Sequence, residues 1–348
     1  MNTVAPTDSR PDPKAVSPRA RAVLRSSVVW DNHACMPLRP GDVAFLPQLE
    51  RVRQAGINVV SLNVSFDVVD PRDAFQMLAT FRHWIGQRPQ HYVLAETVAD
   101  IEAARAQGRL AVVFDIEGGN AVAAHPGLVE TFYRLGVRWM LFAYNKNNKL
   151  GGGCMDDDPG LTDYGRQIID EMEKVGMVLC CTHVGHRTAF EAMEYARNPV
   201  IFSHSNPSAV YPHVRNISDD LMKACARSGG VVNINGVGMF LGAGPDGRGD
   251  NSTETLLRHI DYAAQLIGPD HVGLGLDYVF DVAELEEYLQ QHPDMFPASL
   301  QRPGGYLQVE PERFPLIAEG LLKMGYSDRD VQGIMGDNNL RVARQVWR

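Results

Sequence analysis

The chain has 348 residues, 45% of them hydrophobic and 22% charged, which is enough apolar material for one large buried core. A formal net charge of −9 without a basic stripe argues against a nucleic acid partner, and no apolar window reaches the ~18 residues of a membrane span. The five cysteines are an odd number and indicate a reducing compartment, so we expect a cytoplasmic protein that acts on a small molecule.

The N-terminal residues 1–24 differ in composition from the rest of the chain. They are rich in Pro, Arg, Asp and Ser and lack the apolar stretch of a secretory signal, so we predict a flexible arm. No break in composition divides residues 25–348, and α/β barrels of this size form single domains. We therefore predict one domain over residues 25–348.

Short apolar runs recur along this domain and show little polar alternation, as parallel strands covered by helices do. The runs are residues 27–30, 57–64, 110–116, 139–143, 177–181, 199–202, 230–234 and 272–276. Between them lie segments with helical periodicity, including residues 162–175, 218–225, 253–267 and 312–324. Further along, Ser327 with Asp330 three residues later is a capping signal.

This alternation of strand and helix predicts an α/β fold, namely a (β/α)8 TIM-type barrel with a metal site at the C-terminal ends of the strands. The alternative is an open doubly wound sheet. That fold binds phosphate through a glycine-rich turn after its first strand, and no such turn follows residues 27–30.

Most of the runs end beside a residue that can bind a metal or move a proton. These residues are Asp31, His33, Glu117, Tyr144, His183, His204, Asn235 and Asp277. A histidine at one strand end is usually structural, and turn chemistry mostly uses Asn, Asp, Gly and Ser. Three histidines and an acid at four different strand ends indicate a metal site instead.

Spacing within the first run supports this prediction. Asp31, His33 and Cys35 occupy alternate positions, so their side chains point to one side of an extended strand. Asp115 and Glu117 are related in the same way, and a buried carboxylate is costly unless it is paired or binds a metal. Two glycine- or proline-containing loops, residues 241–252 and 290–305, are predicted either to shape the pocket as lids or to be tolerated insertions.

The order and context of these residues resemble the renal (membrane) dipeptidase family. The matching motifs are DNHACMP (31–37), IEGG (116–119), THV (182–184), SHSN (203–206), VRN (214–216), HVGLGLD (271–277), GYS (325–327) and GDNNLRV (336–342). They extend over nearly all of the chain beyond the arm.

The resemblance implies an amidohydrolase-like barrel with a binuclear zinc site, one or two divalent ions in this chain, that cleaves dipeptides through a metal-bound hydroxide. It implies that His33 holds the first metal, that Glu117 bridges both, and that His183 and His204 hold the second. Arg215 would bind the carboxylate of a dipeptide-like substrate, and Asp277 would transfer a proton. A homodimer is left open.

Three positions depart from the family. Cys35 stands where the family has Asp; we expect it to be a ligand or near-ligand, and a neutral thiol there would favour a single metal. Tyr144 replaces a histidine that steadies the oxyanion, a role for which a phenol can donate one hydrogen bond. Cys180 replaces an acid, and we expect it to change the support of His183.

Two other functions stay open at this point. One is a hydrolase of another small amide or a lactone on the same scaffold, since a fold does not fix a substrate. The other is a degenerate barrel that binds a ligand without turning it over, suggested by Cys35 and Tyr144.

Overall fold

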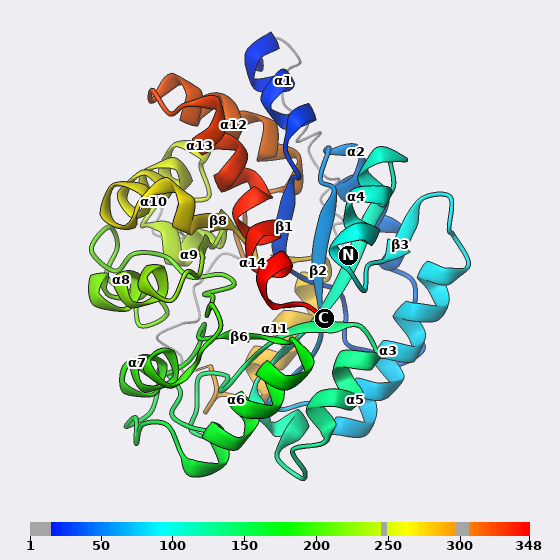
Figure 1. The fold of residues 1–348 in the computed structure, drawn as a ribbon, viewed down its shortest axis with the longest axis vertical. Helices are drawn as coiled ribbons and strands as arrows, with labels where there is room; N and C mark the ends of the chain where they lie inside the picture. Colours follow the sequence, from blue (N-terminus) through cyan, green and yellow to red (C-terminus); the bar gives the residue numbers. More distant parts are fainter. Residues whose placement is uncertain (1–14, 245–248, 297–305) are drawn as a thin grey trace.

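The structure is a computed structural model that describes residues 15–244, 249–296 and 306–348. Parallel strands form its centre and helices surround them (Figure 1). The strands are β1 (Trp30–Cys35), β2 (Val59–Phe66), β3 (Tyr92–Leu94), β4 (Leu110–Glu117), β5 (Val137–Leu141), β6 (Val178–Cys180), β7 (Val232–Ile234), β8 (Val272–Leu274) and β9 (Tyr278–Val279).

The helices differ widely in length. They are α1 (Pro18–Ser26), α2 (Leu49–Gln54), α3 (Pro71–Gly86), α4 (Val98–Ala106), α5 (Leu128–Arg134), α6 (Asp163–Val175), α7 (His186–Tyr195), α8 (Asp219–Arg227), α9 (Gly238–Leu241), α10 (Thr253–Ile267), α11 (Val282–Gln291), α12 (Phe314–Lys323), α13 (Asp328–Gln332) and α14 (Asn338–Val346).

The strands close into a ring. Their hydrogen-bonded order is β6-β5-β4-β2-β1-β9, and β7 pairs with β8. Parallel bridges from Cys180 to Ile201 and from Phe202 to Val232 join β6 to β7. On the other side, the backbone N–H of Asp277 donates to the carbonyl of His33 at 2.9 Å, which connects the end of β8 to β1. The predicted α/β barrel is confirmed.

Two details of the predicted strands were wrong. The run 199–202 pairs only through Ile201 and Phe202, since it begins with a proline that has no N–H to give to a ladder. A strand absent from the prediction, β3, lies outside the ring and pairs with the first half of β4. It is only three residues long, too short for its periodicity to be recognised.

The helices follow their predicted limits closely. Helix α10 spans the predicted residues 253–267, and α6 begins directly after Thr162, whose side chain accepts from the N–H of Gly165. Ser327 and Asp330 form the expected capping box of α13. The capping residues in the sequence therefore predict where these helices begin.

The last part of the predicted flexible arm, residues 18–24, is helical. Helix α1 begins at Pro18, is capped by Ser17 and buries Ala20 and Val23, beside α12 in Figure 1. Two apolar residues three positions apart were enough to pack one face of this otherwise polar segment. Residues 1–14 lie outside the described part of the chain, and the division into an arm and one domain stays a prediction.

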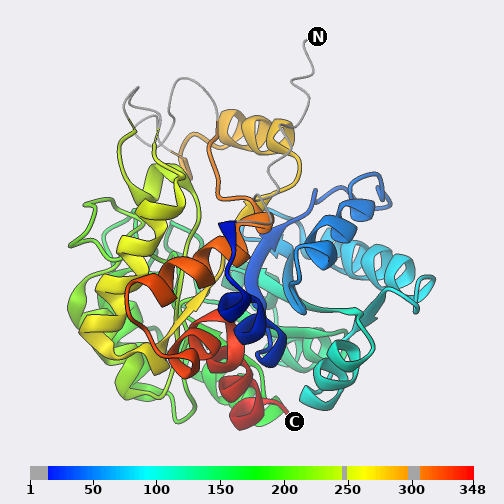
Figure 2. The same cartoon turned by 90° about the horizontal axis from the view of Figure 1, so that it is seen from above.

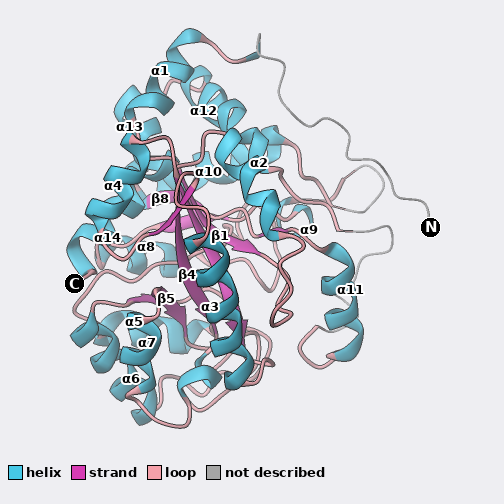
Figure 3. Cartoon of the chain, turned by 90° about the vertical axis from the view of Figure 1, so that its right-hand side faces the viewer, coloured by secondary structure: helices cyan, strands magenta, loops and turns pink. Residues whose placement is uncertain are grey.

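Helix α11 lies outside the surrounding layer of helices, beyond one end of the strands (Figures 2 and 3). It follows β9 directly, in a stretch for which the sequence predicted no helix. Of the two predicted lid loops, residues 245–248 and 297–305 fall outside the described residues. No helix in the described ranges combines the length and the apolarity that crossing a bilayer requires.

Candidate metal centre and substrate cavity

The predicted ligands come from different strands and meet at one end of the barrel. His33 and Cys35 lie on β1, and Glu117 is the last residue of β4. His183 follows β6, and His204 follows the bridged residues 201–202. Because the carboxyl ends of parallel strands share one end of a barrel, the closed ring of strands brings these groups together.

Glu117 is at the centre of the group. Its Oε1 atom lies 3.3 Å from Nε2 of His204, 3.4 Å from Nε2 of His33 and 3.5 Å from Nε2 of His183. This atom is buried and has no hydrogen-bond partner. A buried carboxylate oxygen without a partner is strongly disfavoured, so the arrangement fits a bound cation.

Two of these histidines, His183 and His204, have their Nε2 atoms close to each other. His183 Nδ1 lies 2.7 Å from Asn145 Oδ1, and His204 Nδ1 lies 2.9 Å from Ser203 Oγ. These contacts hold protons on the Nδ1 atoms and leave the Nε2 atoms, 3.1 Å apart, as acceptors. Ligand atoms on one tetrahedral zinc ion are roughly 3.3–3.5 Å apart, close to the separations found here.

The protonation of these rings also suits a metal. Burial, then Arg215, lowers the pKa of His183 well below its usual value. Burial, then His33, lowers the pKa of His204 in the same way. Both rings are therefore neutral at physiological pH, which is the form that coordinates metals. Glu117, His183 and His204 form one candidate ligand group.

A second candidate group shares Glu117 and adds His33 and Cys35. The thiol Sγ of Cys35 lies 3.4 Å from His33 Nε2 and 3.6 Å from Asp277 Oδ1. Burial raises the pKa of Cys35, so without a cation the thiol keeps its proton. A cation is therefore what would make Cys35 a thiolate ligand.

Cys180 lies between the segments that carry His183 and His204. Its thiol lies 3.1 Å from Ser203 Oγ, and Ser203 is the residue that contacts His204. Its Sγ also accepts from the backbone N–H of Thr182, the residue before His183, at 3.5 Å. Cys180 therefore contacts the segments that carry both histidines, and its effect on the support of His183 stays a prediction.

Asp277 is held in an unusual backbone conformation. Its φ is +57°, and the only other non-glycine residues with positive φ in the described ranges are Asn145 (+62°) and His183 (+66°). All three line the same cavity. Such conformations cost free energy and persist where the surrounding structure imposes them, as at functional sites. The side chain of Asp277 accepts from Asn235 Nδ2 at 3.0 Å.

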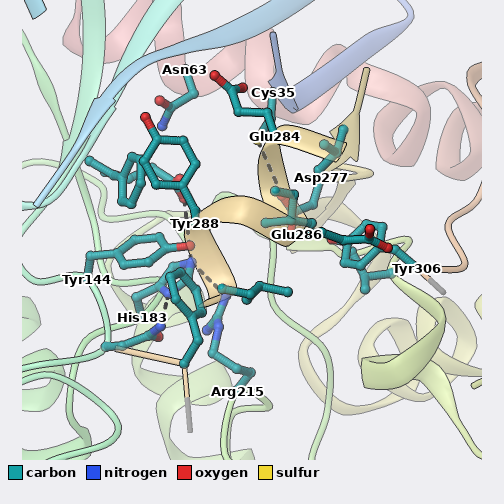
Figure 4. A pocket seen from close by; sticks show the side chains of 18 of the residues that line it. Cys35, Asn63, Tyr144, His183, Arg215, Asp277, Glu284, Glu286, Tyr288 and Tyr306 are labelled. Atoms are coloured by element: carbon teal, nitrogen blue, oxygen red, sulfur yellow. Dashed lines mark hydrogen bonds and ion pairs between the residues drawn. The ribbon is translucent and has the colours of Figure 1, made fainter. Parts of the chain in front are cut away.

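Tyr144 and Arg215 face this cavity from one side (Figure 4). The Tyr144 ring stacks on His183 with 4.1 Å between ring centroids. Burial, and then Glu117, raises the pKa of Tyr144 well above its usual value, so the phenol keeps a proton to donate. Arg215 is buried, and its Nη2 donates to His183 Nε2 at 2.9 Å.

Asp67 was missed by the sequence prediction, although it directly follows β2. Its carboxylate accepts from the backbone N–H groups of Asn120 at 2.9 Å and Tyr144 at 3.1 Å, and from Asn148 Nδ2 at 2.9 Å. Asp67 thus joins the ends of β2, β4 and β5. The available signal was its position: it is a carboxylate at a strand end, like Glu117 and Asp277.

The cavity above these groups has a volume of about 360 Å³. Its floor carries the charged residues Glu117, Arg215 and Asp277. Glu284 and Glu286 also line it, and the rest of its lining is largely apolar. Part of its wall is α11, which the prediction also missed. A concave, mostly apolar site with a few convergent polar groups is typical of a small-molecule site.

Known proteins resemble this chain over most of its length. A sequence model of the family described as membrane dipeptidase (Peptidase family M19) matches residues 18–348. Dipeptidase tcpJ of Claviceps purpurea is 28% identical over 278 residues, which are 79% of this chain and 60% of that protein. An uncharacterized protein in the pqqA 5′ region of Klebsiella pneumoniae is 31% identical over 80% of this chain and 98% of its own length.

Solved structures share the fold. An amidohydrolase from Pseudomonas aeruginosa superposes with a TM-score of 0.85 at 27% identity, covering 94% of this chain and 99% of that one. The resemblance inferred from the motifs is therefore confirmed.

Proposed function

Since this chain belongs to the membrane dipeptidase family (Peptidase family M19), we propose that it is a zinc-dependent dipeptidase that cleaves the amide bond of a dipeptide with a free carboxylate. The observation that carries the proposal is the unpartnered Oε1 of Glu117 among three imidazole Nε2 atoms. In an ordinary core an unpaired oxygen of this kind would destabilise the fold, because buried polar atoms there are paired.

The ligands of the proposal are His33, Cys35, Glu117, His183 and His204, with Glu117 shared between two positions. When bound there, divalent zinc lowers the pKa of a bound water toward about 7 and polarises the scissile carbonyl. The surrounding contacts of Asn145 and Ser203 hold the rings of His183 and His204 in the required orientation.

The remaining residues act on the substrate. Arg215 binds the substrate carboxylate with its planar guanidinium, for which it is already desolvated at the cavity floor. Tyr144 donates its phenolic hydrogen to the carbonyl oxygen as negative charge develops there. Asp277 accepts the proton of the attacking water and delivers it to the leaving amine.

Elemental analysis with an activity panel tests the proposal. Protein purified without chelators is expected to carry one or two zinc ions per chain and to hydrolyse dipeptides. Glu117→Gln removes the shared charge and is expected to reduce both metal content and activity at least tenfold. The matched control is His186→Ala, an exposed histidine bound to Asp220, which is expected to change neither.

Cys35→Asp extends this experiment to the first metal position. A carboxylate is expected to raise its occupancy, because it needs no deprotonation at neutral pH, whereas burial raises the pKa of the thiol. Equal turnover by chelator-treated and zinc-loaded protein, or full activity and metal content in Glu117→Gln, would contradict the proposal.

A further inference from the structure

Helix α11 places apolar side chains over the proposed metal centre. None of its residues is buried, yet Leu285 and Tyr288 line the cavity. Residues three positions apart lie on one face of a helix, so both side chains belong to the same face. Glu287 is exposed and does not line the cavity. Leu285, Tyr288 and Leu289 thus supply the apolar contacts of α11 with the space where a substrate binds, and Glu284, Glu286 and Gln290 of the same helix border it as well.

Polar contacts hold α11 in this place. The N–H of Leu38 donates to the two carboxylate oxygens of Glu284 at 3.1 and 3.2 Å. Arg39 pairs with Asp281 at 2.9 Å and with Glu284 at 3.3 Å. These contacts lie at the start of the helix and do not involve Leu285 or Tyr288.

The opposite walls of the cavity are also apolar. The Tyr288 and Phe66 rings pack edge to face, with 5.1 Å between their centroids. Near Arg215 the wall is formed by Phe240, whose ring centroid lies 5.5 Å from the guanidinium carbon, and by Met239. A dipeptide with small side chains would leave these surfaces in contact with water, whereas large apolar side chains would cover them.

We propose that the substrates are dipeptides with large apolar side chains and that Leu285 and Tyr288 select for them. This inference rests on the proposed dipeptidase function and specifies its substrate class. One methylene in an apolar pocket is worth about 10-fold or more in discrimination. We therefore expect Leu-Leu to exceed Ala-Ala at least tenfold in kcat/KM.

The test measures kcat/KM for Leu-Leu and Ala-Ala, each as the L,L and the L,D peptide. Leu285→Ala and Tyr288→Ala are expected to lower the Leu-Leu value at least fivefold and to leave the Ala-Ala value within twofold. Glu287→Ala, on the exposed side of the same helix, is expected to leave both unchanged. Similar wild-type values for the two peptides, or equal losses for both in Leu285→Ala, would overturn the inference while dipeptidase activity stands.

A binding measurement separates this inference from the proposed activity. Phosphinate analogues of Leu-Leu and Ala-Ala bind without turnover and are titrated calorimetrically into the zinc-loaded protein. If the Leu-Leu analogue binds more tightly but no peptide is hydrolysed, the dipeptidase proposal is contradicted and the selection for large apolar side chains is supported. Equal affinity for both analogues, or no binding of either, contradicts the selection by α11.

Discussion

Asp277 combines a functional position with a backbone conformation that few residue types accept. It follows β8, has φ of +57° and lies beside Cys35 and Asn235. Asp is among the residues that tolerate this conformation best, and Asn tolerates it equally well. A change from Asp to Asn therefore removes the carboxylate and keeps the backbone conformation at this position.

We predict that Asp277→Asn lowers kcat about 100- to 10,000-fold, since an amide cannot accept and pass on a proton. Zinc content is expected to stay unchanged, because Asp277 is not among the proposed ligands. Steady-state kinetics and elemental analysis of the same preparation measure both quantities. Turnover within twofold of the wild type would remove Asp277 from the proton transfer.

The ligand residues could be predicted because each lies within five residues after an apolar run, as Glu117 and His183 do. Asn145 could not be predicted in the same way. It supports His183 through a side-chain contact across two loops, and that contact depends on the path of the loop after β5. Asn directly after the strand-end Tyr144 was a weak local signal, since Asn is enriched at positive φ.

At the scale of secondary structure, Asp67 couples three strand ends through hydrogen bonds to backbone N–H groups. Asp67→Asn replaces one accepting oxygen by a donor and leaves an N–H of Asn120 or Tyr144 without an acceptor. We predict a loss of about 1–3 kcal/mol in the free energy of unfolding, the usual penalty of an unpaired buried donor. We also predict a fall in kcat, because the backbone of Tyr144 loses its anchor.

A double-mutant cycle with Tyr144→Phe measures this coupling. If Asp67 positions Tyr144, Tyr144→Phe lowers kcat less in Asp67→Asn than in the wild type. Asp157→Asn, an exposed acid on the loop after β5, is the matched control. Additive effects on kcat would show that Asp67 only stabilises the fold.

Helix limits were predictable where a cap marks them, as at Thr162 and Ser327, because capping depends on a few neighbouring residues. Helix α11 was not predicted. Its apolar residues line a cavity and none of them is buried, and its place is fixed by contacts of Asp281 and Glu284 with Arg39 far along the chain.

At the scale of the whole molecule, ring closure is what brings residues from position 33 to position 277 into one cavity. The alternation of runs predicted this closure, because parallel strands with covering helices have few stable arrangements. The same closure buries Asp31 and Glu117 together. Burial raises the pKa of Glu117 to about 8 and that of Asp31 to about 7 in the metal-free protein.

These pKa values predict how the stability of the metal-free protein depends on pH. A carboxyl group whose pKa is raised by folding keeps its proton in the folded chain after the unfolded chain has lost it. Its stabilising contribution is complete below about 4.5, the unfolded value for Glu117, and is lost as the pH rises to about 8. The lowered pKa values of His183 and His204 act in the opposite direction, but only below about 6.5.

His33 acts in the same direction as the carboxyl groups, because Glu117 raises its pKa well above the usual value against the opposing effect of burial. Between pH 6.5 and 8 these groups together set the slope, and we predict that Tm of the chelator-treated protein falls by several degrees over this range. Zinc is expected to abolish the fall, because a cation stabilises ionised Glu117 and competes with protons for its ligands. Thermal unfolding at fixed ionic strength, with and without zinc, measures both curves. Metal-free Glu117→Gln has no proton to lose at this position, so its Tm is expected to fall less steeply with pH than that of the wild type. An equally steep fall of Tm would exclude Glu117 as the cause of the pH dependence.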